Sequence, residues 1–427
     1  MSTLALLGGR PVISGPLEPY NTIGGGEVEA VSRVIRSGRI SSFIGAWCED
    51  FDGGPEIKAF EKAWAERFNC KYAISVNSNT SGLIAALGAI RVGPGDEVIV
   101  PPLTMSATVM APLFYGAIPV FVDVEPDYFC LDPVKVREAI TPMTRAILAV
   151  DLFGHPAELL ELRKLADEKG IYLIEDAAQA PLAEESGHFA GTVGHIGVFS
   201  LNYHKHIHTG EGGMCCTDDD ELALRLRAIR NHGENIVEPL NIVDSTNLIG
   251  FNFRMTELSA AIGLEQMKKV NTLVGEREAI ATRLSKALCG LPGLVPPAIR
   301  PGCRHVYYVW AARYDAHVTG ISRGTIAKAL NAEGVPIWEG YVKPLYLLPA
   351  FQRRIAIGSK GWPFTLTERQ YLKGMCPIAE DLFERSLLEF CICSYSLKEP
   401  DQADVIKAFH KVFTALPDLA DFEKKPE

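Results

Sequence analysis

Short apolar runs alternate with helical patterns between about residues 70 and 220, and this alternation most constrains the fold. The apolar runs lie at residues 72–76, 97–100, 119–124, 146–152, 172–174 and 198–201. Helical stretches such as residues 156–169 separate several of them. Strands that are almost wholly apolar are buried on both faces, which is typical of a parallel sheet covered by helices. The sequence therefore predicts an α/β fold with a mainly parallel central sheet.

The pattern changes after a long helical stretch that begins near residue 256. Residues 306–314 resemble a strand, the following TIAKALNAEG resembles a helix, and a long irregular stretch runs from Tyr341 to about Met375. A chain of 427 residues is longer than one compact core usually accommodates. We therefore expect a large domain over residues 1–270 and a smaller C-terminal α+β domain over residues 271–427.

Charge and composition restrict the classes of partner. The net charge is -10, and an acidic surface repels phosphate backbones, so nucleic acid is not expected as a partner. Residues 98–122 carry no charged side chain, but four prolines interrupt them, so we expect no membrane span. The N-terminus lacks the pattern of a signal peptide, and the ten cysteines lack zinc-ligand spacing. Reduced thiols and a cytoplasmic location are expected.

Polar residues follow two of the predicted strands. The stretch VNSNTSG, residues 76–82, lies between a strand and a helix, where free N–H groups and hydroxyls bind phosphate. Simple capping of the helix by one of its polar residues is the alternative. The stretch IEDAAQA, residues 174–180, places Asp176 directly after an apolar strand. That carboxylate either faces a ligand cation or caps the next helix.

The stretch FSLNYHKHIHTGEGG, residues 199–213, holds Lys205 between His204 and His206, with His208 two residues further on. In an extended segment the three histidines share one side, which makes a metal site conceivable. No carboxylate or cysteine with familiar ligand spacing accompanies them, so no metal is expected. The lysine itself is either solvated or held in place for covalent chemistry.

The three stretches together indicate a cofactor. A phosphate site, a carboxylate at a strand end and a later lysine are what pyridoxal 5′-phosphate (PLP) requires. The lysine forms a Schiff base with the cofactor aldehyde, and the carboxylate keeps the pyridine nitrogen protonated. An ion pair at about 4 Å and an effective dielectric constant near 20 supports that protonation by about 4 kcal/mol.

Several motifs carry a resemblance that extends from about residue 24 to about residue 409. They are SGRI, FEKAWAERF, GPGDEVIVPPLT, GAIPVFVDVEPDYFCLDP, DLFGHPAE, IEDAAQA, FSLNYHKHIHTGEGG, RNHG and FNFRMTELSAAIGLEQ. With them the chain resembles the DegT/DnrJ/EryC1/StrS family of PLP-dependent sugar aminotransferases. That family lies within the fold-type I aspartate aminotransferase superfamily. The resemblance implies the aspartate aminotransferase-like fold for the large domain.

The resemblance also implies roles for individual residues. Lys205 is similar to the Schiff-base lysine, Asp176 to the partner of the pyridine nitrogen, and Gln179 to the contact of the cofactor hydroxyl or ring face. Phosphate contacts are implied for Ser78, Asn79, Thr80 and Ser200. Asn252 is similar to the residue that reaches the phosphate of the other subunit's cofactor, which implies a homodimer with shared sites. Arg254 and His232 are implied near the substrate.

Three departures from the family pattern stand out. Met105 occupies a position where the family has an aromatic residue against the cofactor ring, and a thioether covers a ring less rigidly. An extra segment, SFIGAWCEDFD at residues 42–52, lies where the family's substrate and dimer contacts are found. The C-terminal EFCICSYSL, residues 389–397, replaces an apolar run that contains proline.

The expected activity is transfer of an amino group, from glutamate by family resemblance, to a keto sugar. The resemblance favours a nucleotide-linked sugar or a related cyclitol ketone. Some relatives replace the lysine with histidine and remove water from sugars, but Lys205 is present here. A PLP-dependent sugar dehydratase, a non-catalytic regulator on the same fold and a metal-binding protein that uses the three histidines remain the alternatives.

Overall fold

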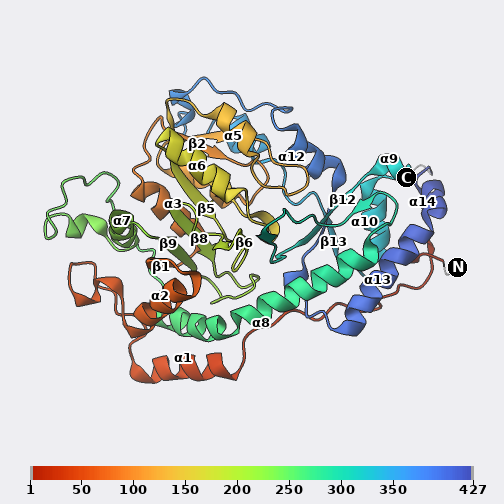
Figure 1. The fold of residues 1–427 in the computed structure, drawn as a ribbon, viewed down its shortest axis with the longest axis horizontal. Helices are drawn as coiled ribbons and strands as arrows, with labels where there is room; N and C mark the ends of the chain where they lie inside the picture. The colour runs from red at the N-terminus through yellow and green to blue at the C-terminus, as the bar shows by residue number, and fades with distance from the viewer. Residues whose placement is uncertain (1–2, 425–427) are drawn as a thin grey trace.

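A seven-stranded sheet forms the centre of the computed structural model, which describes residues 3–424 (Figure 1). Across the sheet the strands are β1 (Tyr72–Val76), β9 (Gly213–Thr217), β8 (Ile196–Ser200), β5 (Tyr172–Asp176), β4 (Thr144–Val150), β2 (Glu97–Val100) and β3 (Ile118–Phe121). Neighbouring strands from β8 to β3 pair in parallel, and β9 runs antiparallel to both β8 and β1. The predicted α/β fold with a mainly parallel sheet is confirmed.

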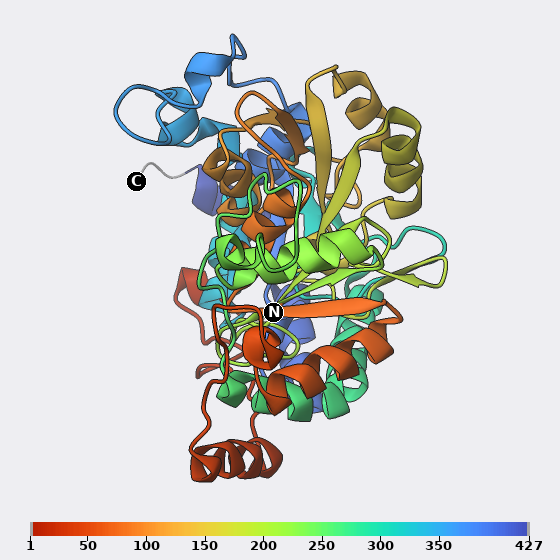
Figure 2. The same ribbon diagram turned by 90° about the vertical axis from the view of Figure 1, so that its left-hand side faces the viewer.

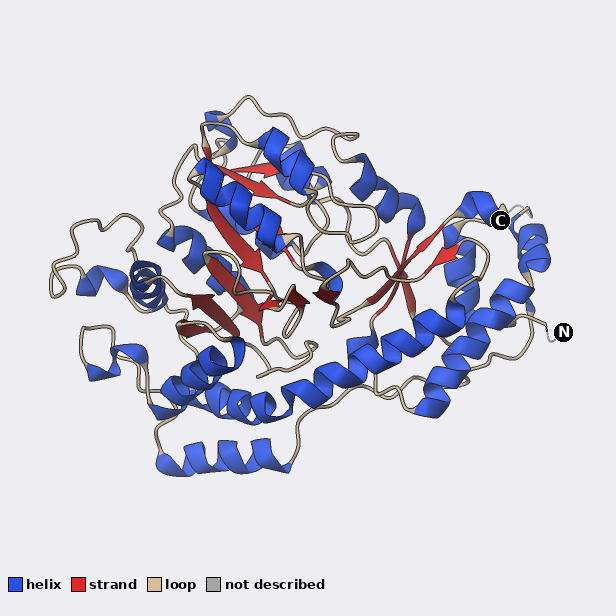
Figure 3. Cartoon of the chain, in the orientation of Figure 1, coloured by secondary structure: helices blue, strands red, loops and turns tan. Residues whose placement is uncertain are grey.

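Helices surround this sheet, as Figures 1 and 3 show. They are α2 (Pro55–Phe68), α3 (Asn79–Ala89), α4 (Ser106–Phe114), α5 (Pro133–Ala139), α6 (Leu159–Lys169) and α7 (Asp220–Arg230). The strands between them are buried along nearly their whole length, as in β2, β3 and β9. A small three-stranded sheet adds β11 (Cys303–Arg304), β6 (Glu184–Glu185) and β7 (His188–Phe189).

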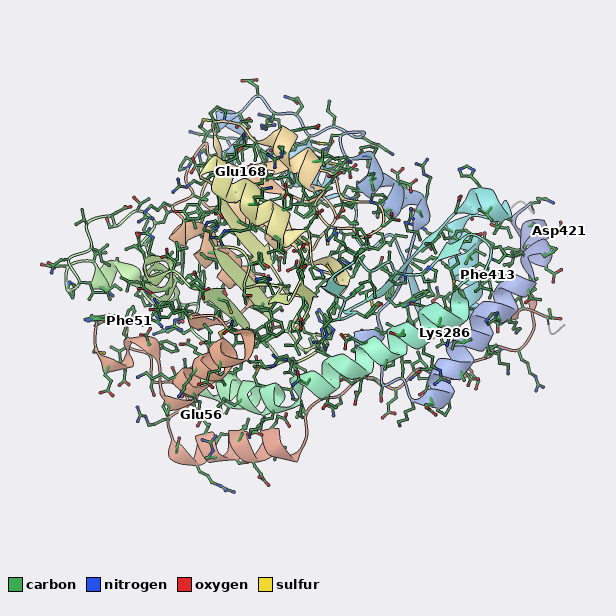
Figure 4. The ribbon with its side chains drawn as sticks, in the orientation of Figure 1. Phe51, Glu56, Glu168, Lys286, Phe413 and Asp421 are labelled. Atoms are coloured by element: carbon green, nitrogen blue, oxygen red, sulfur yellow. The ribbon has the colours of Figure 1, made fainter. Side chains whose placement is uncertain are left out.

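One helix, α8 (Glu257–Leu288), links the two ends of the molecule. It begins where the Thr256 side chain accepts a hydrogen bond from the Ser259 N–H at 3.1 Å. Its first half packs against α2 and against α1 (Gly25–Ser37), which lies on its outer side (Figures 1 and 2). Its second half packs against α13 (Glu399–Thr414), and Figure 4 labels Lys286 of α8 and Phe413 of α13 in this region.

A second, antiparallel sheet lies beside the second half of α8. Its strands, in order, are β10 (Leu294–Val295), β12 (Trp310–Tyr314), β14 (Leu387–Phe390) and β13 (Ile337–Glu339). The accompanying helices are α9 (Ala316–Thr319), α10 (Arg323–Ala332) and α14 (Leu416–Glu423), together with α13. Leu388 and Phe390 of β14 face a second hydrophobic core that also contains Leu4 and Leu17.

The irregular stretch after β13 returns to the large sheet. It carries α11 (Pro349–Gln352) and α12 (Pro377–Asp381) and packs Phe351 and Phe364 into the first hydrophobic core. The Tyr371 hydroxyl donates to the Pro119 carbonyl of β3 at 3.1 Å. Each core therefore contains residues from both sides of residue 270, which itself lies inside α8. A division at that residue into two folding units stays a prediction.

A buried ion-pair network joins α2, β1 and α7 to the extra segment at residues 42–52. Arg230 of α7 is fully buried and contacts the Glu61 carboxylate at 2.6 Å and the Asp52 carboxylate at 2.9 Å. Glu61 also accepts hydrogen bonds from the N–H and the hydroxyl of Ser75.

Among residues 3–424 we find no helix that combines the length and the apolar character needed to span a bilayer.

Replacing Arg230 by methionine leaves the Glu61 carboxylate buried without its cation, so we expect unfolding to require about 3–5 kcal/mol less free energy. Urea unfolding followed by circular dichroism measures this as a lower midpoint. Arg33→Met is the matched control, because the Arg33 side chain is 59% exposed where it pairs with Glu56 and should cost under about 1 kcal/mol. Equal losses in the two variants would contradict the proposed role of the network.

Candidate active site

The predicted site residues gather at the carboxyl end of the parallel strands. Asp176 is the last residue of β5, Ser200 is the last of β8, and Ser78 follows β1 by two residues. These three strands lie close together in the sheet, with β9 between β8 and β1. Ligands bind at this edge of α/β sheets because the connecting loops and helix N-termini converge there.

Lys205 lies buried in the loop after β8. Its N–H donates to the Asn202 carbonyl at 2.9 Å, and its Nζ lies 4.2 Å from the centroid of the Tyr308 ring. Within residues 3–424 no side chain or carbonyl forms a hydrogen bond with Nζ. Burial lowers the pKa of the Lys205 amine to about 8, and the nearby Asp176 carboxylate opposes this shift. About a tenth of this amine is neutral at pH 7, far more than of an ordinary lysine, which favours its role as a nucleophile.

Asp176 is held by two helices. Its Oδ2 accepts a hydrogen bond from the Thr108 hydroxyl of α4 at 2.8 Å, and its Oδ1 accepts one from the Asn79 amide of α3 at 3.2 Å. The Ala178 N–H adds a third at 3.2 Å. Burial raises the pKa of Asp176, while these donors and the charge of Lys205 lower it. The arrangement fixes the direction of a buried carboxylate that can pair with a cationic ring nitrogen.

The N-terminus of α3 has the character of an anion site. Ser78 caps the helix by accepting a hydrogen bond from the Ser81 N–H at 3.1 Å. In the described part of the chain, the N–H groups of Asn79 and Thr80 have no acceptor. The side-chain amide of Asn79 is committed to Asp176 and to the Val198 carbonyl, so only its N–H is available for an anion. A phosphate fits this helix start.

Ser200 and Gln179 complete the predicted cofactor contacts. The Ser200 hydroxyl is half-buried and accepts from the Asn202 N–H at 3.3 Å. The side-chain oxygen of Gln179 accepts a hydrogen bond from the Phe153 N–H at 2.7 Å. Its side-chain nitrogen donates a hydrogen bond to the Tyr341 hydroxyl at 2.9 Å. Gln179 therefore ties the sheet edge to the segment after β13.

Three residues that contact the predicted site were not singled out from the sequence: Thr108, Tyr308 and Tyr341. A threonine in an otherwise apolar helix was a signal for Thr108, because a buried hydroxyl needs a polar partner. Tyr308 and Tyr341 lie more than a hundred residues after Lys205, and the tertiary fold brings Tyr308 to the Lys205 Nζ and Tyr341 to Gln179. Met105 precedes α4 as its N-cap residue and is 58% exposed, and its sulfur accepts a hydrogen bond from the Ser106 hydroxyl at 3.2 Å.

Asn252, Arg254 and His232 form a neighbouring cluster. Arg254 donates from Nε to the Asn252 Oδ1 at 2.8 Å, and Asn252 forms an isolated bridge with Asn231. Asn231 in turn donates to the carbonyls of Ile44 and Phe51 at 2.9 Å, which anchors the extra segment at residues 42–52. His232 adopts a positive φ of 53° beside Gly45. Contact of this cluster with substrate or with a partner subunit stays a prediction.

The three histidines around Lys205 have different polar neighbours, although the His204 and His206 rings both lie near the Tyr308 ring. The His206 ring is buried, and its Nε2 lies 2.8 Å from the Val306 carbonyl. The His208 Nδ1 accepts from the Gly210 N–H at 3.3 Å, and the His204 ring packs edge-on against Tyr203. Over residues 3–424 no three histidine, cysteine or acidic side chains are grouped so that they could hold a metal ion.

Comparison with known proteins agrees with this geometry. The model of the DegT/DnrJ/EryC1/StrS aminotransferase family matches residues 43–408. The chain belongs to this family. It is therefore an aminotransferase.

Two relatives and one solved structure illustrate the similarity. An L-glutamine:2-deoxy-scyllo-inosose aminotransferase of Streptomyces kanamyceticus is 34% identical over 96% of this chain and 97% of its own. A dTDP-3-amino-3,4,6-trideoxy-alpha-D-glucose transaminase of Streptomyces venezuelae is 36% identical over 75% of this chain and 79% of its own. An aminotransferase structure from Psychrobacter cryohalolentis superimposes with a TM-score of 0.82 at 30% identity, covering 94% of this chain and 100% of its own.

The lowered pKa of Lys205 predicts unusual reactivity of its amine. In the cofactor-free protein, competitive labelling with an acylating reagent should reach half its maximum rate near pH 8 at Lys205. Exposed lysines should do so near their ordinary pKa of about 10.4. Asp176→Ala should lower the Lys205 midpoint further, because it removes the anion that favours the charged amine. Mass spectrometry of peptides measures each site, and a Lys205 profile equal to that of exposed lysines would contradict the assignment.

Proposed function

We propose that the aminotransferase binds PLP between Lys205, Asp176 and the N-terminus of α3, and transfers an amino group to a ketone on a polyhydroxylated six-membered ring. The observation that carries the proposal is the buried Lys205 amine, without a hydrogen-bond partner in residues 3–424, together with the Asp176 carboxylate held by Thr108 and Asn79. When bound, PLP supplies an electron-withdrawing ring that stabilises negative charge on the carbon next to the transferred nitrogen.

The residues fit the three polar features of this cofactor. The free N–H groups at the start of α3, with the Ser78 and Ser200 hydroxyls nearby, suit its phosphate. Asp176 suits its ring nitrogen, because a buried carboxylate favours the protonated form. Gln179 suits its ring hydroxyl or ring face, and Met105 suits the other face. These assignments use side chains from α3, α4 and the ends of β5 and β8.

Lys205 also has the properties of the group that moves the proton during transfer. A general acid or base works best when its pKa is close to the working pH, and burial brings the Lys205 pKa to about 8. The Tyr308 ring lies against its Nζ and limits the directions from which water reaches the amine. Asp176 remains in place throughout and keeps the opposite end of the site negative.

The acceptor and the donor are proposed from relatives. The relative that acts on a cyclitol ketone matches nearly the full length of this chain, and the relative named for a dTDP-linked sugar matches three quarters of it. We therefore place a cyclitol ketone first and a nucleotide-linked keto sugar second. The donor is L-glutamine or L-glutamate, of which the first is named for the cyclitol relative.

We further propose a homodimer in which Asn252 reaches the cofactor phosphate of the partner subunit. The surface around Asn252 supports this, because Ile249 and the extra-segment residues Ile44 and Trp47 expose apolar side chains. Exposed apolar groups concentrated near a polar cluster are typical of protein interfaces. A cytoplasmic location is part of the same proposal.

Isotope transfer tests the reaction. The enzyme loaded with PLP is given L-glutamine labelled with ¹⁵N at the α-amine, together with 2-deoxy-scyllo-inosose or a dTDP-linked keto sugar. The label should appear in a ring amine, and Lys205→Ala should lower the rate by roughly 10²–10⁴-fold. Lys62→Ala, at an exposed lysine, is the control. A product that has lost oxygen and contains no ¹⁵N would support the sugar dehydratase instead.

Asp176→Asn keeps a polar side chain of the same shape but removes its charge. Loss of up to about 4 kcal/mol of electrostatic support should lower kcat by roughly 10²–10³-fold, while PLP still binds. Stopped-flow measurement of the donor half-reaction separates this rate from binding. Asp167→Asn, at an exposed position on α6, should leave the rate unchanged. A similar rate in Asp176→Asn and the wild type would contradict the assignment of Asp176.

A further inference from the structure

The unusual segment EFCICSYSL begins with the last two residues of β14, an inner strand of the second sheet, and continues into the turn after it. Leu388 and Phe390 point into the second hydrophobic core, and Leu387 belongs to the first. Because side chains alternate along a strand, Glu389 lies on the same face as Leu387. Ala311, directly opposite Glu389 on β12, also belongs to the first core. Glu389 therefore faces the part of the molecule that carries Lys205.

Glu389 is a buried acid with an unused oxygen. Its side chain is 2% exposed, and its Oε1 has no hydrogen-bond partner in the part of the chain that the structure describes. Burial raises the pKa of Glu389 to about 8, although the Tyr341 N–H and the Arg323 guanidinium oppose the shift. Most buried polar atoms in proteins are satisfied, so this unpartnered carboxyl oxygen calls for a partner, which a ligand hydroxyl can supply.

An exposed aromatic side chain lies directly across from this acid. Trp338 of β13 is the cross-strand partner of Glu389 and is 63% exposed. Side chains of directly opposed residues share one face of a sheet and lie about 5 Å apart at Cβ. A polyhydroxylated ring has an apolar C–H face and polar hydroxyl groups. The indole of Trp338 can contact the C–H face, and the carboxyl group of Glu389 can bond to the hydroxyls.

The face of the second sheet that carries Glu389 and Trp338 continues toward the proposed catalytic residues. Tyr341 follows β13 by two residues, and its hydroxyl accepts the hydrogen bond from Gln179. Cys391 follows Glu389 by two residues and is near enough to Lys205 for the two groups to interact electrostatically. Glu389 interacts in the same way with both Tyr341 and Cys391. Tyr341 thus connects Glu389 to Gln179 and through it to the proposed cofactor site.

We propose that Glu389 and Trp338 form the subsite for the acceptor ring, in which the Glu389 carboxyl exchanges hydrogen bonds with ring hydroxyls and Trp338 covers the C–H face. This inference rests on the proposed function. The Glu389 carboxyl group carries no positive charge, so it cannot form an ion pair with the carboxylate of an amino-acid donor. A hydroxyl of the acceptor ring, in contrast, can donate a hydrogen bond to the Glu389 carboxyl group or accept one from it. The subsite is therefore specific for the ketone and not for the donor.

The test compares the two half-reactions in the PLP-loaded enzyme. We expect Glu389→Leu and Trp338→Ala to lower kcat/KM for 2-deoxy-scyllo-inosose roughly ten- to a hundredfold, with the L-glutamine half-reaction changed less than about twofold. Glu389→Gln should restore part of the loss, because an amide still bonds to hydroxyls. An unchanged donor half-reaction also shows that each variant has folded.

Matched controls separate recognition from packing. Glu380→Gln alters another buried carboxyl, which accepts from the Gly374 N–H at 2.6 Å on the far side of the irregular stretch. Val318→Ala alters another exposed apolar side chain of the smaller region. Neither should change the ratio of the two half-reactions. As a readout without turnover, saturation-transfer NMR with myo-inositol should show weaker binding to Glu389→Leu and Trp338→Ala than to the wild type.

Each outcome decides between the two proposals. Equal losses in both half-reactions, or no loss in either, would show that Glu389 and Trp338 are structural and would overturn the subsite. A wild-type enzyme that transfers nitrogen to neither ring ketone would overturn the proposed function. In that case the NMR measurement with myo-inositol still tests the subsite. Equal binding of myo-inositol by the variants and by the wild type would contradict it.

Discussion

A buried charge at the edge of the central sheet organises the rest of this structure. Asp176 lies at the end of β5, where an isolated carboxylate would be costly, and it persists because three donors and the amine of Lys205 surround it. Those donors come from α3, from α4 and from the turn after β5. Both helices are themselves positioned by packing against neighbouring strands. The need to satisfy one anion therefore fixes the relative placement of elements that are far apart in the sequence.

The smaller region contributes to the site by a different route. Its antiparallel sheet brings β14 and the segment after β13 toward the large sheet, so that Tyr341 meets Gln179. Tyr308, in the loop before β12, covers the amine of Lys205. The residues of the proposed site thus come together at the junction between the two sheets. The strand ends of the large sheet alone would leave Lys205 open to water on one side.

Much of this arrangement was predictable from the residues. Apolar strands in alternation with helices indicated the parallel sheet, and local motifs at strand ends made Asp176 and Lys205 candidate site residues, whose roles stay a prediction. Contacts between distant segments were not predictable in the same way. Asn79 illustrates the limit, since its position at a helix start suggested phosphate contact, whereas its side chain turns inward to Asp176. No local pattern distinguishes these two directions for one amide.

The long helix α8 has a mechanical consequence. It continues without interruption for 32 residues, about 48 Å at 1.5 Å per residue, and packs at one end on α1 and α2 and at the other on α13. If the regions around the two sheets rotated relative to each other, α8 would have to break or lose its packing against the helices at one of its ends. The irregular stretch after β13, which is pinned to Pro102 and Pro119, forms a second tether between the halves. The two sheets are therefore joined twice, by the continuous helix and by this hydrogen-bonded stretch, and Tyr308 covers Lys205 where they meet.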